Sequence, residues 1–293
     1  MLYQVSHNTI CRYDSPVTVC HYHARLVPRR LPFQSCPWHE LTIDPEPLQR
    51  FARQDVFGNT TIYFEIEGAH KELKVVSRSM IEIVPFIAPL GRNSPPWENI
   101  RDDCNSPRWN VASPAGEFVC DSPLIRSTGS MREYVSPSFP KGRPILEGVL
   151  DLNHRIFTDF IFDPSATHAA TSVEEVWKKK RGVCQDFAQV MIGCLRSIGL
   201  PARYVSGYLE TQPPPGKEKL IGADASHAWL SAWCGEKMGW LDLDPTNDLM
   251  PSSRHITLAW GRDFSDVSPL RGVTLGAGNQ KLIVAVDVSA EKS

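Results

Sequence analysis

The chain has 293 residues, of which 42% are hydrophobic, and its 31 basic and 33 acidic residues leave a formal net charge of −2. A nearly neutral chain lacks the positive field that binds nucleic acids or anionic membranes, so neither is an expected partner. The N-terminal residues lack a basic start followed by an apolar core, and no apolar run approaches the ~18 residues of a membrane span, which favours a cytoplasmic location.

The first part of the chain, residues 1–85, is rich in β-forming residues separated by turn signals. This pattern predicts a β-rich N-terminal domain that resembles a small sandwich, with strands at 2–13, 39–45, 59–67 and 71–84. His21 and His23 lie two residues apart there, but alternation along a strand explains that spacing without a metal ion. No metal site is predicted.

Prolines and turn-forming residues become frequent after residue 85, which marks residues 86–143 as a connector with a short helix. Residues 144–293 are expected to form the catalytic core. An apolar stripe predicts a helix over 144–159, and Thr171 or Ser172 begins a second helix, with acidic capping partners downstream. Strands follow at 203–209, 227–234, 239–244, 255–260 and 281–289. Helices followed by an antiparallel sheet predict an α+β domain.

Cys184 is predicted to open a third helix. Phe187, Met191, Leu195 and Ile198 recur after it at helical spacing, and Gly199 ends the run. A thiol at a helix start faces unpaired backbone N–H groups and the positive end of the helix dipole, which favour the reactive thiolate. The basic run 178–181 just before it is typical of a solvated face and is assigned the smaller effect.

His227 and Asp244 lie on two strand-like segments separated by Gly235, Glu236 and Lys237. A two-residue turn at Gly235-Glu236 would place His227 directly opposite Asp244, close enough for a carboxylate to accept a hydrogen bond from an imidazole. A slip by two residues could instead bring Asp242 opposite His227, so Asp242 is the alternative orienting group.

Each of these residues also has a purely structural interpretation. Cys184 could be a small core residue, since the eight cysteines include no C-x-x-C pair and most are expected to be buried free thiols. His227 could be a satisfied structural histidine, and residues 244–247 could form an Asx turn at the end of a strand. The combination of a nucleophile, a base and an orienting carboxylate favours a catalytic triad over these readings.

Four motifs in this order resemble the bacterial transglutaminase-like family: R-G-V-C-Q-D-F-A at 181–188, I-G-L-P-A-R-Y-V-S-G-Y-L at 198–209, A-S-H-A-W at 225–229 and G-W-L-D-L-D-P-T-N at 239–247. The resemblance implies a papain-like core with a catalytic Cys184, His227 and Asp244, which makes Asp242 the weaker alternative. Residues 1 to about 85 are similar to the β-rich region that precedes the core in bacterial members.

A triad of this kind predicts acyl transfer from a peptide or glutamine-type amide, through a thioester on Cys184, to an amine or to water. The Cys184 backbone N–H is the expected oxyanion donor, and Gln185, Tyr208 and Trp229 are candidate substrate contacts. No cofactor is expected, and no calcium loop is present in the sequence. The alternatives are a cysteine peptidase or amidase that uses only water, acetyl transfer from a thioester to an arylamine, and a peptide-binding module without catalysis.

Overall fold

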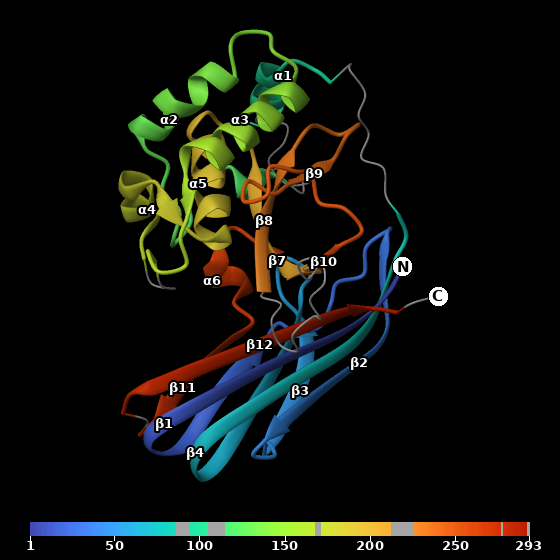
Figure 1. Ribbon diagram of the computed structural model, residues 1–293, viewed down its shortest axis with the longest axis vertical. Helices are drawn as coiled ribbons and strands as arrows, with labels where there is room; N and C mark the ends of the chain where they lie inside the picture. The colour runs from blue at the N-terminus through green and yellow to red at the C-terminus, as the bar shows by residue number, and fades with distance from the viewer. Residues whose placement is uncertain (86–93, 105–114, 168–170, 212–225, 277, 292–293) are drawn as a thin grey trace, which may run out of the picture.

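Two antiparallel sheets dominate the computed structural model, which describes residues 1–85, 94–104, 115–167, 171–211, 226–276 and 278–291 (Figure 1). The larger sheet contains six strands and the smaller one four, and the helices gather on the smaller sheet (Figure 1). No helix in these described ranges is long and apolar enough to cross a membrane. The predicted combination of helices and antiparallel sheet is confirmed.

The larger sheet is built around two long strands, β1 (Leu2–Ala24) and β4 (Thr60–Ile83), which pair along most of their length. The strands β2 (Gln34–Asp44) and β3 (Gln49–Gln54) pair with β4. Alternate residues of β1 from Tyr3 to Tyr13 are buried, as period-two patterning requires. The pairing with β4 is irregular between Arg12 and Val19, and beyond it the buried residues are Cys20, Tyr22 and Ala24.

The chain returns to this sheet at its C-terminal end. The strand β11 (Leu270–Leu275) pairs with the second half of β1, and β12 (Gln280–Ala290) pairs with the first half. The expected core of residues 144–293 therefore needs correction, because its last two strands are hydrogen-bonded to the N-terminal sheet. The strand at 281–289 was predicted from its own pattern, whereas its partner sheet and the strand β11 were not.

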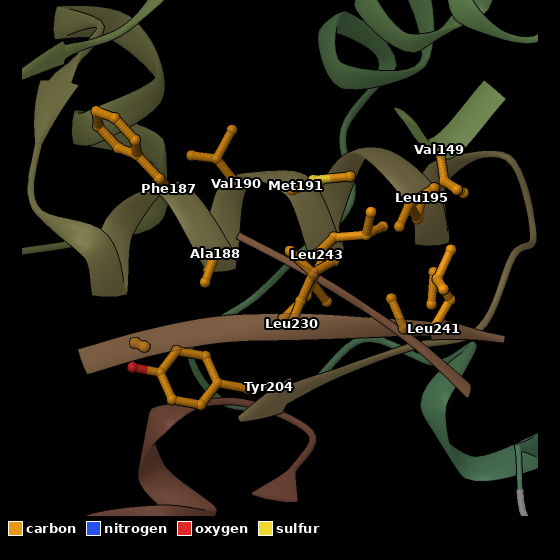
Figure 2. Close-up of a cluster of buried hydrophobic side chains, with 14 of the residues drawn as sticks. Val149, Phe187, Ala188, Val190, Met191, Leu195, Tyr204, Leu230, Leu241 and Leu243 are labelled. Atoms are coloured by element: carbon orange, nitrogen blue, oxygen red, sulfur yellow. The ribbon is translucent and has the colours of Figure 1, made fainter. Parts of the chain in front are cut away.

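The smaller sheet has the strand order β10-β7-β8-β9. Its strands are β7 (Ala202–Leu209), β8 (Ser226–Trp233), β9 (Trp240–Leu243) and β10 (His255–Gly261). The helix α5 (Cys184–Ser197) packs across it, and Figure 2 shows Met191 and Leu195 of the helix facing Leu230, Leu241 and Leu243 of the strands. These residues are buried, so their packing holds α5 against the sheet and thereby positions its first residue, Cys184.

Further helices surround α5 and complete the core. The helix α3 (Ile145–Asp159) matches the predicted apolar stripe, and α4 (Val173–Lys179) begins after Ser172, whose hydroxyl accepts the Glu175 N–H at 3.2 Å. The other elements are α1 (Trp97–Cys104), η2 (Gly116–Phe118), α2 (Gly129–Val135), η3 (Ser136–Ser138), β5 (Ile161–Phe162), β6 (Arg181–Gly182) and α6 (Phe264–Val267).

Side-chain amides join the two sheets at the outer edge of β10. Gln34 donates to the carbonyl of Thr257 and accepts its N–H, both at 2.8 Å. Asn59 does the same at Trp260, with distances of 2.8 and 3.0 Å. Both amides therefore bond the β10 backbone as a neighbouring strand would, which covers part of an otherwise open sheet edge.

Candidate active site

Cys184 is the first residue of α5, where the backbone N–H groups have no partner within the helix. The Asp186 carboxylate folds back over this turn and accepts the Val183 N–H at 2.8 Å and the Thr167 hydroxyl at 2.7 Å. Gly182 leaves room for it, since a Cβ atom at Gly182 would lie only 2.8 Å from the Cβ of Asp186. The local sequence thus fixes the thiol at the positive end of the helix.

The hairpin that carries His227 and Asp244 has a different register from the predicted one. Leu230 pairs with Leu243 and Trp233 with Trp240, and the turn spans residues 235–238, closed by a Cys234 N–H to Gly239 carbonyl bond of 2.9 Å. The prediction of a two-residue turn was wrong. The shift is by two residues, so every side chain stays on the predicted face of the sheet.

His227 and Asp244 consequently meet diagonally instead of directly across the hairpin, and His227 Nε2 lies 2.7 Å from Asp244 Oδ2. Asp242, the alternative orienting group, bonds elsewhere: it accepts the Ser231 hydroxyl and, at 3.3 Å, the indole N–H of Trp229. The described structure brings Cys184, His227 and Asp244 together and leaves Asp242 outside the group.

The Asp244 carboxylate is fully buried and surrounded by donors. Its Oδ1 accepts the backbone N–H groups of Thr246 and Asn247 at 3.0 and 3.3 Å, and its Oδ2 accepts His227 and the Asn247 side-chain amide, both at 2.7 Å. Burial alone would raise the pKa of Asp244, but these hydrogen bonds and the one from His255 lower it well below the ordinary carboxyl value. Asp244 is therefore ionised. Residues 244–247 form the Asx turn that the sequence also allows, and the same carboxylate contacts His227.

His255 is a second histidine on the same carboxylate. Its Nδ1 accepts the Ser252 N–H at 3.3 Å, so its proton is on Nε2, which donates to Asp244 Oδ2 at 3.2 Å. Sequence reasoning missed this residue and Asn247 as members of the site. For Asn247 the signal was its place three residues after Asp244 in the predicted turn, whereas His255 lies on another strand and had no local signal.

His227 is 9% exposed, and burial alone would lower its pKa. Hydrogen bonds to Asp244 and to Cys184, together with the negative charges of both groups, outweigh that effect and raise the His227 pKa to about 10. Nε2 is bound to Asp244, so Nδ1 is the ring nitrogen available to the thiol. The arrangement favours a protonated imidazole beside a thiolate, the state in which sulfur is nucleophilic.

Replacing Cys184 with Ala is expected to lower the pKa of His227, because the hydrogen bond and negative charge of the thiolate are lost while Asp244 remains. Imidazole NMR titrations of the wild-type protein and the variant measure the change, with His227→Gln identifying the resonance. The same His227 titration curve in both proteins would contradict the thiolate–imidazole pair.

Ligand atoms of His227, Asp244 and His255 lie within 4.8 Å of one another, the one such group in the described ranges that could hold a metal ion. Both histidines direct Nε2 at Asp244 Oδ2, and His255 carries its proton on that atom. A metal would have to displace these bonds, because a coordinating imidazole nitrogen carries no proton. The donor set fits a hydrogen-bonded carboxylate better than a metal centre.

The predicted substrate contacts lie in three different environments. Gln185 is half-buried beside Cys184 on the first turn of α5, and its role stays a prediction. Tyr208 is 1% exposed and its hydroxyl lies 2.9 Å from His7 Nδ1, so it joins β7 to β1 in the interior of the protein. Trp229 is fully buried, its ring is tilted against that of His227 and meets that of His255 edge-on, and it lines a cavity that Cys184 and His227 do not line.

Two family models match separate parts of the chain. Residues 3–82 match the bacterial transglutaminase-like N-terminal region, and residues 136–245 match the transglutaminase-like superfamily. A protein of Mycobacterium tuberculosis with no assigned function is 43% identical over 293 residues and shares 98% of this chain and 92% of its own length. A similar protein of Mycobacterium leprae is 30% identical over 290 residues, covering 98% of both chains.

Two further relatives have an assigned activity or a solved structure. A protein-glutamine gamma-glutamyltransferase of Pseudomonas aeruginosa is 35% identical over 100 residues, which are 34% of this chain and 15% of the transferase. The structure of a candidate cysteine protease of Cytophaga hutchinsonii superposes with a TM-score of 0.76 at 16% identity, covering 100% of this chain and 91% of the other. The second similarity extends over both sheets and establishes the shared fold.

Proposed function

The chain belongs to the transglutaminase-like superfamily, and from that premise we propose that it is a cysteine-dependent acyltransferase acting on glutamine-type or peptide amides. The observation that carries the proposal is the contact set of His227, which bonds the buried Asp244 carboxylate at 2.7 Å and the Cys184 thiol on its other side. A nucleophile, a base and an orienting group in this order are what covalent catalysis on an amide requires.

In the first half of the reaction, the Cys184 thiolate attacks the amide carbonyl carbon and a tetrahedral oxyanion forms. The Cys184 backbone N–H, at the start of α5, is positioned to donate to that oxyanion. Protonated His227 then transfers its proton to the departing nitrogen, the carbon–nitrogen bond breaks, and a thioester on Cys184 remains. Asp244 holds the imidazole orientation and stabilises its positive charge.

In the second half, neutral His227 removes a proton from the acceptor, which attacks the thioester and releases the thiolate. An amine acceptor gives a new amide, and water gives a carboxylic acid. Glutamine-type donors are favoured by the sequence shared with the Pseudomonas aeruginosa glutamyltransferase, whose 100 matched residues are 35% identical. Hydrolysis is the second candidate, since the same thioester is open to water.

The test is to incubate the protein with an N-blocked Gln-Gly dipeptide, with and without a primary amine, and to measure ammonia release and the mass of the products. We expect ammonia release and amine incorporation by the wild-type protein, and a loss of about 10³-fold or more in Cys184→Ala. Cys120→Ala removes an exposed cysteine outside the site and should retain the wild-type rate.

The possible outcomes separate the two candidates. Ammonia release that yields only the glutamate product in the presence of amine identifies hydrolysis. No ammonia release from the dipeptide or from longer glutamine peptides contradicts the proposed donor class. Equal activity in Cys184→Ala and wild type contradicts the covalent mechanism itself.

A further inference from the structure

A cavity of about 490 Å³ lies between the two sheets, on the face of the smaller sheet that α5 does not cover. Its walls combine Leu31 and Phe33, which lie just before β2, with Trp229, Trp240 and Trp260 of the smaller sheet. Cys184 and His227 do not line it, because Trp229 and His255 stand between His227 and the cavity. Its size is that of a small-molecule site.

Arg203 is the cation in this mostly apolar space, which Asp242 also lines. The residue is 9% exposed and lines the cavity, and its guanidinium lies between two indoles, with its central carbon 4.4 Å from the Trp240 ring centre and 3.7 Å from that of Trp260. Its Nε donates to the Ser231 hydroxyl oxygen at 3.2 Å. The stacking and this bond fix the plane of the guanidinium.

The outer edge of that guanidinium, formed by its two terminal nitrogens, makes no hydrogen bond to the described residues. Some polar side-chain atoms without a partner are fully enclosed by protein, but these two nitrogens are not among them. Both nitrogens therefore keep accessible surface, which for a side chain buried this deeply is the surface of the cavity. Two parallel N–H donors on a fixed plane are the arrangement that binds a carboxylate through both of its oxygens.

The surrounding charges leave this cation incompletely neutralised. Asp242 is the nearby carboxylate, but its oxygens accept the Ser231 hydroxyl and the Trp229 indole N–H. A second guanidinium, that of Arg29, lies 3.5 Å above the Trp260 ring. Burial is the largest cause that lowers the pKa of Arg203; Asp242 opposes it, Arg29 adds to it, and the pKa is lowered to about 9. An added anion would offset the burial cost of the two cations.

We propose that this cavity binds a small aromatic carboxylate, with the carboxylate on the outer edge of Arg203 and the ring against the apolar wall. Phe33, Ile83 and Met250 line that wall and supply apolar surface for a flat ring. A neutral apolar ligand would leave the Arg203 donors unpaired, which is unfavourable in a buried site. Binding is measured without turnover, so the proposal does not depend on the proposed reaction.

Isothermal titration of the full chain with 3-phenylpropionate and with its neutral match, 3-phenylpropanamide, tests the proposal. We expect the acid to bind at least about tenfold more tightly than the amide. Arg203→Met keeps much of the apolar stem, removes the donors and should abolish that preference. Met250→Trp adds a ring at the cavity wall without changing a charge and should weaken binding of the acid by about tenfold or more.

Arg12→Met is the matched control, since it removes an exposed arginine paired with Glu72 on the larger sheet, away from the cavity, and should bind like wild type. If Arg203→Met does not fold, Met250→Trp still locates the site. The proposal is overturned by equal binding of acid and amide, by wild-type binding in Met250→Trp, or by no heat signal for the acid up to about 10 mM.

Discussion

Asp244→Ala is expected to lower the free energy of unfolding by about 3–5 kcal/mol, because it removes one member of a buried charge pair and leaves the other unpaired. The carboxylate is fully buried and accepts hydrogen bonds from His227, His255 and Asn247 as well as two backbone N–H groups. The same change should reduce the rate of acyl transfer by about 10³-fold or more, since His227 loses the group that orients it.

The loss of stability should depend on pH in a defined direction. The folded-state pKa of Asp244 is lowered, so its stabilisation is present above the ordinary carboxyl pKa of ~3.9 and is lost as pH falls through the lowered value. The folded-state pKa of His227 is raised to about 10, so its contribution is complete below ~6.5 and is lost as pH rises through 10. Urea unfolding should therefore show the largest difference between wild type and Asp244→Ala at pH ~4–6.5.

Asp242→Ala is the matched comparison. Asp242 is two residues away on the same face, but its hydrogen bonds in the described structure come from Ser231 and Trp229 and not from His227. We expect Asp242→Ala to retain most of the acyl-transfer rate. An equal loss of rate in the two variants would show that Asp244 is not the specific orienting group.

Gly182→Ala is expected to reduce the acyl-transfer rate by about 10²-fold and stability by about 1–3 kcal/mol. The new methyl group would meet the Asp186 carboxyl group and lie 2.8 Å from its Cβ. Asp186 cannot move without losing its bonds to the Val183 N–H and to Thr167, which hold the first turn of α5. Displacing that turn moves the Cys184 thiol relative to His227, and covalent catalysis depends steeply on such positioning.

Gly129→Ala provides the control, since no atom lies within 4 Å of the position where its Cβ would stand, at the start of α2. Alanine favours a helix over glycine, so this variant should be as stable as wild type or slightly more stable. Thermal unfolding and the ammonia-release rate of both variants give the comparison. A wild-type rate in Gly182→Ala would show that the start of α5 tolerates displacement or that Asp186 is not needed to hold it.

The sequence was sufficient to predict the helix that begins at Cys184 and the contact between His227 and Asp244, because helical spacing and strand alternation are local patterns. The turn was predicted two residues too short, yet the contact survived, since an even shift keeps side chains on the same face. A shift of one residue would have placed Asp244 on the opposite face from His227.

The remaining differences come from contacts between segments far apart in the chain. The pattern of residues 281–289 predicts a strand but says nothing about which sheet it joins, and it pairs with β1. His255 likewise reaches Asp244 only because β10 joins the smaller sheet through β7. Tyr208 is a candidate substrate contact in the sequence, whereas the approach of β1 buries it against His7.

The pairing of β1 with β12 also determines when the larger sheet can be completed during synthesis. β1 is the first strand of the larger sheet to leave the ribosome, and β12 is the last. Until β12 is made, the edge of β1 along Tyr3–Tyr13 lacks its final partner while the strands and helices between them are already available to fold. An uncovered strand edge can pair with another chain, so the larger sheet is open to such pairing along β1 until β12 has been made and has docked.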